Sequence, residues 1–446
     1  MQIYDTQNRP IQLGREAGKG GEAVIYEVVG QPERLAKLYT GPPRAGYDQK
    51  LSWMLDYPPH DPTLDQGHAS IAWPTELLYD NRQQLVGYLM PYIKNAVPLL
   101  EVFNPRMRAR KLPGFDLRYL YRTARNLVIT LAAIHAQSYV VGDINESNVL
   151  VTPTAMVTVI DTDSFQVQEK EGAKLVVYPC PVGKPEYTSP ELQGRSFQHT
   201  VQKPEQDCFG LGVLIFQLLM DGSHPFRARW TQTGDPPPIE ERIRQGCFPH
   251  VEQPSCPVVV PKTMLGLDTL YSKLAHLMGL CFVEGHQQPH RRPSPDLWEQ
   301  ALTEAEKLLQ PCPQNHYYTS HLTDCPYCAL KQQRQQAHRQ RTVARQPQPT
   351  IRTRNVTQSA NILSSKNLAM PIPAQTQPTL THTQPKQVAM SVNQMIKCPN
   401  CGTSNSNTDI YCQKCVYQLC GNRWCIHCNH ETPMLSSYCV HCGLPL

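Results

Sequence analysis

Three oxygen-bearing side chains follow one another at a spacing that suits work on a polyphosphate. Asp143 and Asn148 lie five residues apart within the run Val141–Val151, and Asp161 ends the hydrophobic run that comes next. On a loop and the following hairpin, such residues can supply a general base and two hard oxygen ligands for magnesium. Each alone would be an ordinary turn former, but their order and spacing favour phosphoryl-transfer chemistry.

A glycine cluster near the N-terminus could bind the phosphates of the same substrate. Glycine lets a backbone approach phosphate oxygens and present its N–H groups to them, although a tight hairpin would explain the cluster equally well. Lys37 lies in an apolar run and could reach the α- and β-phosphates, or it could face water from an edge strand. The glycines that precede the β-like run are Gly14, Gly18, Gly20 and Gly21, with Ala23 opening the run itself.

The elements that must position these residues change character along the first 308 residues. Short β-like runs come first, at Ala23–Val29 and Leu85–Tyr92, and longer helical patterns follow, at Arg118–His135 and Phe209–Met220. Small strands followed by larger helices are typical of a two-lobed α+β architecture. We therefore expect one such domain over 1–308.

The last fifty residues, 397–446, contain a repeated arrangement of cysteine pairs. In each copy two C-x-x-C pairs are separated by ten residues. Four thiolates at this spacing form a closed tetrahedral zinc site, whose binding supplies the folding free energy that so short a segment lacks. Disulfides would instead need an oxidising compartment. The predicted zinc ligands are Cys398, Cys401, Cys412 and Cys415 in the first copy, and Cys425, Cys428, Cys439 and Cys442 in the second.

A shorter cluster, in the segment 309–330, predicts a third zinc site. Cys312, Cys325 and Cys328 would supply three thiolates, and either His316 or His321 the nitrogen. A cysteine cluster without metal is the alternative. The unpaired cysteines of the larger domain are expected to be small buried side chains; these are Cys180, Cys208, Cys247, Cys256 and Cys281.

The segment 331–396 predicts a disordered basic linker. It holds nine Lys or Arg, no Asp or Glu and few aromatic residues, so it cannot bury enough apolar surface to fold alone. The linker thus carries +9 while residues 1–330 carry −5, so the basic excess is a feature of the linker and not of the folded body, and the net charge of +5 is poor support for nucleic-acid binding through the linker or the zinc ribbons. No apolar run approaches the length of a membrane span, and no signal peptide is expected. Metal thiolates favour a reducing, cytoplasmic location.

The order of these motifs resembles that of the eukaryotic-like protein kinases over about 1–305. Gly18–Ala23 is similar to their glycine-rich loop, Lys37 to the lysine of their third strand and Asp143 to the catalytic aspartate. The resemblance implies ATP and magnesium as cofactors and Ser or Thr of protein substrates as acceptors. It assigns ATP contacts to Met90 and Ile93 as well as to the glycines, Ala23 and Lys37, and magnesium to Asn148 and Asp161.

The same resemblance extends to the end of the domain. Glu191, in the run Pro185–Glu191, would pair with Arg292, and Asp207 would begin the buried helix that anchors the catalytic loop. The runs at 71–80 and 161–166 are similar to those of a bacterial subgroup with C-terminal double zinc ribbons. In that subgroup, partners are often a metal-dependent phosphatase and a von Willebrand A-type protein. The subgroup also favours His316 over His321 as the zinc ligand.

Departures from the kinase pattern raise a second interpretation. Gly142 stands where the family has an arginine, Asn145 replaces the catalytic-loop lysine, and Asp163 replaces a glycine. The glutamate that should pair with Lys37 from a helix is not evident; the nearest acids are Asp48 and Asp56. A nucleotide-binding scaffold, with zinc ribbons that hold protein or nucleic acid, is therefore the alternative to a catalyst.

Lys184 is expected to be a local peculiarity of the catalytic site. It stands where the family has a threonine, while the loop lysine has become Asn145. A cation near the transferred phosphoryl group stabilises the charge on its equatorial oxygens. Lys184 could therefore take over the role of the missing lysine, or it could simply point into solvent.

Overall fold

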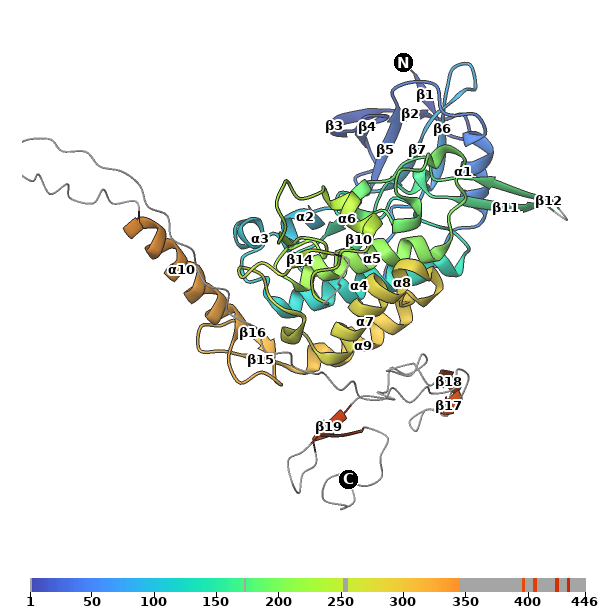
Figure 1. The fold of residues 1–446 in the computed structure, drawn as a ribbon. Helices are drawn as coiled ribbons and strands as arrows, with labels where there is room; N and C mark the ends of the chain where they lie inside the picture. Colours follow the sequence, from blue (N-terminus) through green and yellow to red (C-terminus); the bar gives the residue numbers. More distant parts are fainter. Residues whose placement is uncertain are drawn as a thin grey trace, which may run out of the picture. The chain divides into compact units, whose positions relative to one another are not determined.

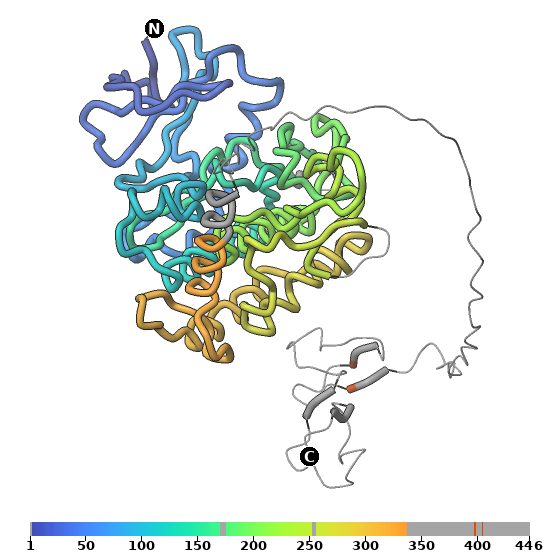
Figure 2. Tube along the Cα trace, turned by 60° about the vertical axis from the view of Figure 1, so that its left-hand side comes forward, coloured from blue at the N-terminus to red at the C-terminus, as the bar shows by residue number. Residues whose placement is uncertain are grey.

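The computed structural model describes residues 2–171, 174–251 and 256–344, together with four short strands between 395 and 433. Contacts along the chain divide it into two units, 1–339 and 340–446. Nearly all of the described residues belong to the first unit, which Figures 1 and 2 show in blue to orange. Among the described residues, no helix is both long and apolar enough to cross a membrane.

The N-terminal lobe is built on a seven-stranded antiparallel sheet, in the order β2-β1-β6-β7-β5-β4-β3. Alternate side chains of these strands pack into a small core of Ile3, Val28, Ala36, Leu78 and Leu89. Helix α1 (Tyr47–Asp56) lies beside this sheet (Figure 1). The strands are β1 (Ile3–Tyr4), β2 (Pro10–Ile11), β3 (Leu13–Lys19), β4 (Ala23–Val28), β5 (Arg34–Tyr39), β6 (Glu76–Asp80) and β7 (Leu85–Pro91).

The C-terminal lobe is mainly helical. Helix α5 (Pro204–Leu219) is apolar on every side and buried from Asp207 onward, as its composition requires. Helix α4 (Leu117–Ala136) packs its apolar face against α5 and against α9 (Pro295–Lys307), and Asp116 caps its first turn. The remaining helices of the lobe are α2 (Leu99–Phe103), α3 (Pro105–Lys111), α6 (Ile239–Gln245), α7 (Ser272–Gly279) and α8 (Gly285–Gln287).

Short strands between these helices carry the loops of the site. Strand β9 (Val149–Val151) pairs with β10 (Val157–Val159) and with β8 (Val97–Pro98). The hairpin of β11 (Val167–Glu171) and β12 (Lys174–Tyr178) projects from the body beyond α1 (Figure 1). A further pair joins β13 (Arg229–Trp230) to β14 (Val258–Val259). The predicted two-lobed α+β fold is thereby confirmed, with each expected strand and helix within a few residues of its predicted bounds.

The first part of the predicted linker is helical, which we did not expect. After the hairpin of β15 (Leu309–Pro311) and β16 (Tyr317–Thr319), helix α10 runs over Pro326–Ala344, so residues 331–344 are helical. The cause is local: this stretch is rich in Gln, Arg and Ala, which favour helix, and it holds no Gly or Pro. Residues 345–394 lie outside the described part of the chain.

In the second unit the description is limited to two hairpins. Strand β17 (Met395–Lys397) pairs with β18 (Ser404–Ser406), and β19 (Asn422–Trp424) pairs with β20 (Glu431–Pro433). In both copies the first strand ends one residue before the first cysteine of the predicted zinc site. The two hairpins thus follow the internal repeat of the sequence, while all eight predicted ligands of the ribbons lie outside the described residues.

Two of the cysteines that were expected to be unpaired are buried as predicted, but they are bonded to each other. Cys247 and Cys256 form a disulfide, with their Cα atoms 5.4 Å apart. Sequence spacing could not indicate this pair, because no motif surrounds it. Cys180, Cys208 and Cys281 are free and buried, as expected.

Candidate active site

A cavity of about 780 Å³ lies between the sheet of the N-terminal lobe and the first loops of the C-terminal lobe. This volume is within the range of small-molecule and cofactor sites.

Gly14 is not part of the wall of this cavity. An added Cβ there would meet the carbonyl oxygen of Glu27 at 3.3 Å, so Gly14 permits the close pairing of β3 with β4, and its predicted contact with ATP is not supported. The other predicted nucleotide residues do line the cavity: Gly18, Gly20, Gly21, Ala23, Lys37, Met90 and Ile93, together with Asp143, Asn148 and Asp161.

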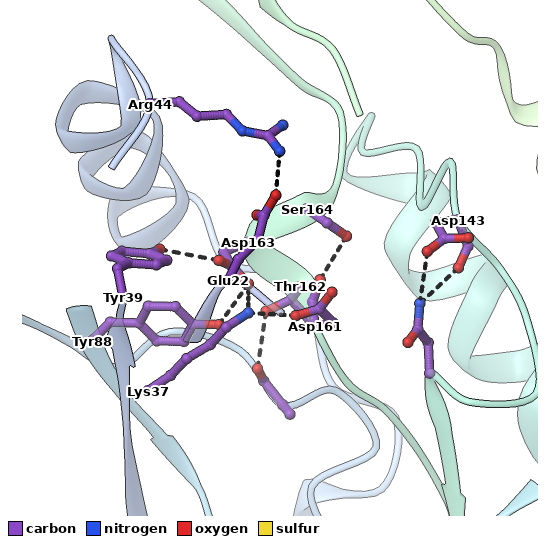
Figure 3. Close-up of polar contacts among 12 residues, drawn as sticks. Glu22, Lys37, Tyr39, Arg44, Tyr88, Asp143, Asp161, Thr162, Asp163 and Ser164 are labelled. Carbon is purple, nitrogen blue, oxygen red and sulfur yellow. Dashed lines mark hydrogen bonds and ion pairs between the residues drawn. The ribbon is translucent and has the colours of Figure 1, made fainter. Parts of the chain in front are cut away.

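Lys37 reaches the cavity from the middle of β5 and ion-pairs with two carboxylates, those of Asp161 and Asp163 (Figure 3). Burial on its own lowers the pKa of Lys37, but the two carboxylates outweigh it, and the net pKa is raised. Lys37 is therefore a charged group at the wall of the cavity. A cation in this place can hold the phosphates of a nucleotide.

Asp143 lies in the loop before β9, where three donors fix its carboxylate. Asn145 Nδ2 donates to Oδ1 at 2.9 Å and Asn148 Nδ2 to Oδ2 at 3.2 Å, and the backbone N–H of Lys184 donates to Oδ1 at 3.1 Å. Burial is the largest influence on this group and raises the pKa of Asp143, against the effect of these donors. The carboxylate is thus oriented and stays basic enough to accept a proton from a nearby hydroxyl.

Asp161 stands at the turn after β10 with a left-handed backbone, at φ 63°. The turn is held by two hydroxyls: Ser164 Oγ donates to the carbonyl of Asp161 at 2.7 Å, and Thr162 Oγ1 donates to the carbonyl of Ala72 at 3.0 Å. The Asp161 side chain remains 40% exposed and faces the cavity. Together with the amide of Asn148, it offers the hard oxygen donors that magnesium prefers, so the residues present fit that ion.

The catalytic loop is anchored from below by Asp207, at the start of α5. Its carboxylate accepts hydrogen bonds from the backbone N–H groups of Val141 and Gly142, both at 2.8 Å, and it contacts His135 Nε2 at 2.8 Å. Gly142 has φ +74°, and an added Cβ would come within 2.4 Å of the Cβ of Cys180. An arginine has no room at this position, because Cys180 occupies the space that its side chain would need.

Glu191 and Arg292 form the predicted pair. The guanidinium binds the carboxylate through two bonds, of 2.7 and 2.6 Å, and also donates to the carbonyls of Gly285 and Glu205. The Arg292 side chain is fully buried. Burial raises the pKa of Glu191, but the bonds from Arg292 outweigh it, so the net pKa lies below the usual value.

The ammonium group of Lys184 lies in an ion pair with Glu146, which is a residue of the catalytic loop itself. The side chain of Lys184 therefore does not contact Asp143. Only the backbone N–H of Lys184 does so. The charge of Lys184 is held beside the loop by a neighbour that the sequence did not indicate as its partner.

Two residues at this site were missed as partners in the sequence. Asp163 is the buried carboxylate that pairs with Lys37, and Lys50 on α1 donates to the backbone carbonyl of Asp163 at 2.6 Å. Burial lowers the pKa of Lys50 to about 8. Asp48, which the sequence had offered as a partner for Lys37, is exposed and contacts the hydroxyl of Tyr79 at 3.3 Å. The available signal was an acid two residues after Asp161, where the family has glycine.

The Cys/His cluster of 312–328 has the geometry of a metal site. The Nδ1 atom of His316 lies 3.6, 3.7 and 3.4 Å from the sulfurs of Cys312, Cys325 and Cys328, and Cys312 and Cys328 are 3.9 Å apart. Tetrahedral zinc with ordinary bond lengths places a sulfur about 3.6 Å from a nitrogen ligand and about 3.8 Å from another sulfur. The four ligand atoms lie within 4.8 Å of one another, so they fit zinc. His321 instead contacts the carbonyl of Asp268 at 2.9 Å.

Comparison with known proteins points in the same direction as the geometry. Residues 85–303 match the family model described as the protein kinase domain. The chain is 30% identical over 339 residues to the protein kinase YegI of Escherichia coli strain K12, and 30% identical over 337 residues to the protein of the same name in Escherichia coli O157:H7. These alignments cover 75% and 74% of this chain but 51% and 50% of the relatives. The chain therefore spans about half the length of the curated relatives it matches, and the comparisons support a protein kinase.

Proposed function

We propose that this protein is an ATP-dependent protein kinase that transfers the γ-phosphate to Ser or Thr of protein substrates. The observation that carries the proposal is the convergence of Lys37, Asp143 and Asp161, from three separate segments, on one cavity of nucleotide size. These residues are the group that positions and stabilises a transferred phosphoryl group. The Ser/Thr assignment rests on the resemblance of the motifs.

In this proposal each residue has one task. Asp143 orients the substrate hydroxyl and accepts its proton, held in position by Asn145 and Asn148. Lys37 holds the phosphates, and the backbone of the loop at 18–23 covers them. Magnesium, when bound by Asn148 and Asp161, neutralises negative charge on the phosphates.

The zinc cluster of 312–328 and the two C-terminal repeats would recognise partners. We assign zinc to Cys312, His316, Cys325 and Cys328 on their geometry, and to the ribbons on their spacing. Partners that the resemblance suggests are a metal-dependent phosphatase and a von Willebrand A-type protein, and we place the protein in the cytoplasm. Nucleic acid is a weaker candidate, since the excess of basic over acidic residues lies in the segment beyond 330 and not in the folded body.

A nucleotide-binding scaffold without transfer activity is the second candidate. The observation in its favour is that the catalytic loop has Asn145 in place of the usual lysine, and that the charge of Lys184 beside the loop is paired with Glu146. Such a protein would bind ATP through the same cavity and present its zinc modules to partners.

The two candidates separate in a transfer assay. The full chain would be incubated with magnesium and γ-labelled ATP, alone and with casein, and the labelled amino acids identified after hydrolysis. We expect label on serine and threonine. ATP binding without labelled protein would favour the scaffold, and label on tyrosine alone would contradict the proposed specificity.

A further inference from the structure

Lys37 has two carboxylate partners, and they differ in their surroundings. The side chain of Asp161 is 40% exposed and lies at the cavity, whereas that of Asp163 is 6% exposed. Asp161 is also the residue that we assign to magnesium. When Asp161 binds a metal ion, Asp163 is the carboxylate that still pairs with Lys37.

Asp163 is held from several sides, as Figure 3 shows in part. The hydroxyl of Tyr88 donates to Oδ1 at 2.8 Å and that of Tyr39 to Oδ2 at 3.0 Å. Lys50, from α1, donates to its backbone carbonyl at 2.6 Å. Burial on its own raises the pKa of Asp163, but Lys37 outweighs burial, so the net pKa is lowered and the group is ionised. Its orientation is therefore fixed before any ligand binds.

This arrangement departs from the usual one. In protein kinases the lysine of the third strand pairs with a glutamate on the helix beside the sheet. Here that helix is α1, and the residue it buries towards the site is Lys50, a cation. Lys37 keeps its place in β5, but its carboxylate partner comes from the turn after β10, and the helix supplies a positive charge that secures that turn.

We propose that Asp163 is the positioning residue for Lys37, in place of a helical glutamate, and that Lys50 couples α1 to this turn. Asp163 keeps the ammonium at the cavity wall, so that Lys37 contacts phosphate while Asp161 is left to the metal. The inference rests on the proposed nucleotide site, but not on transfer activity.

The experiment compares the affinity for ATP, without magnesium, with that for adenosine. In Asp163→Asn, Lys37 keeps Asp161 as its one charged partner of the two, so the ammonium is no longer positioned for the phosphates. We expect ATP affinity to fall about tenfold, to the level of Lys37→Met, with adenosine affinity unchanged within about twofold. The double variant should lose no more than either single one, because both remove the same interaction. Calorimetric titration of purified full-length protein measures all of these values.

Charge repulsion alone predicts the opposite change in ATP affinity for Asp163→Asn. If repulsion were the only effect, removing the Asp163 carboxylate near the phosphates would raise the affinity for metal-free ATP instead of lowering it. Asp48→Asn, on the exposed face of α1, is the matched control and should change nothing. A smaller version of the change is Tyr88→Phe, which keeps every charge and removes one bond to Asp163; we expect a loss of a few-fold in ATP affinity.

Two results would overturn the inference. One is wild-type ATP affinity in both Asp163→Asn and Tyr88→Phe. The other is an equal loss of ATP and adenosine, which would mean that Asp163 supports only the fold. A wild-type protein that binds ATP but transfers no phosphate would refute the kinase proposal and leave this inference standing.

Discussion

The interlobe cavity and the Cys/His cluster are both candidate sites, but they are assembled in different ways. The cluster takes four ligands from the 17 residues of 312–328, and their mutual distances follow from one hairpin and the first turn of α10. The cavity takes Lys37 from β5, Asp143 from a loop and Asp161 from a turn. Its geometry therefore depends on the packing of both lobes. The ligands of a local site can be predicted from their spacing in the sequence. The residues of a dispersed site can be predicted only where their motifs resemble those of a known family.

If the cluster is a local site, its loss should spare the cavity. Cys325→Ser should release one of three expected zinc ions and unfold the hairpin of β15 and β16, since structural zinc contributes on the order of 10 kcal/mol to such a segment. ATP affinity should stay within about twofold. Metal analysis and hydrogen exchange measure the two effects, with Cys281→Ala as a control outside the cluster. An unchanged zinc content in Cys325→Ser would refute the site.

The dispersed site instead depends on the stability of the C-terminal lobe, to which the ion pair of Glu191 and Arg292 contributes. Arg292→Met removes a fully buried guanidinium and leaves the partly exposed carboxylate of Glu191 with Gln206 as its side-chain donor, so we expect a loss of about 1–3 kcal/mol in the free energy of unfolding of the C-terminal lobe. Arg292→Lys should recover only part of the loss, because lysine cannot form the two parallel bonds. Urea unfolding at constant zinc measures both. A loss below about 1 kcal/mol for Arg292→Met would contradict this role.

The smallest expected effect concerns the charge next to the catalytic loop. Lys184→Met should lower turnover about tenfold with little change in ATP affinity, as for an interaction made mainly in the transition state. Because Lys184 is paired with Glu146, the companion variant Glu146→Gln frees the ammonium and should not lower turnover to the same degree. Steady-state kinetics with separate nucleotide titrations measure both. Unaltered turnover in Lys184→Met would contradict a contribution of Lys184 to the transfer step and leave it only its ion pair with Glu146.

Much of the fold could be predicted from the sequence because its signals are local. The hydrophobic period of α4 and the uniformly apolar α5 determine how each helix is buried, and the motif order limits the topology. The bounds of α10 were missed because low apolar content was taken to exclude a helix. A run of good helix formers can continue a helix that already packs at its beginning.

The site was predicted less completely, and the failures share a cause. Asp163 was seen only as a departure from a motif, since its contact with Lys37 joins residues 126 positions apart. Gly14 was assigned to the phosphate loop by proximity in sequence, yet it lies near the start of β3, where it faces Glu27 of β4 and is not among the residues that line the cavity. Cys247 and Cys256 gave no spacing signal at all. For Asp163 and Gly14 the deciding partner, Lys37 or Glu27, lies on another strand, and no local pattern contains it.

Phosphoryl transfer by wild-type protein and by Asp143→Asn is the most direct test of the proposed function. The exposed Asp235→Asn serves as the matched control, and thermal unfolding with ATP titration shows that each variant is folded and binds nucleotide. Loss of the oriented base should lower turnover by about 10²–10⁴-fold with ATP affinity nearly unchanged. Undiminished transfer by purified Asp143→Asn would contradict the mechanism.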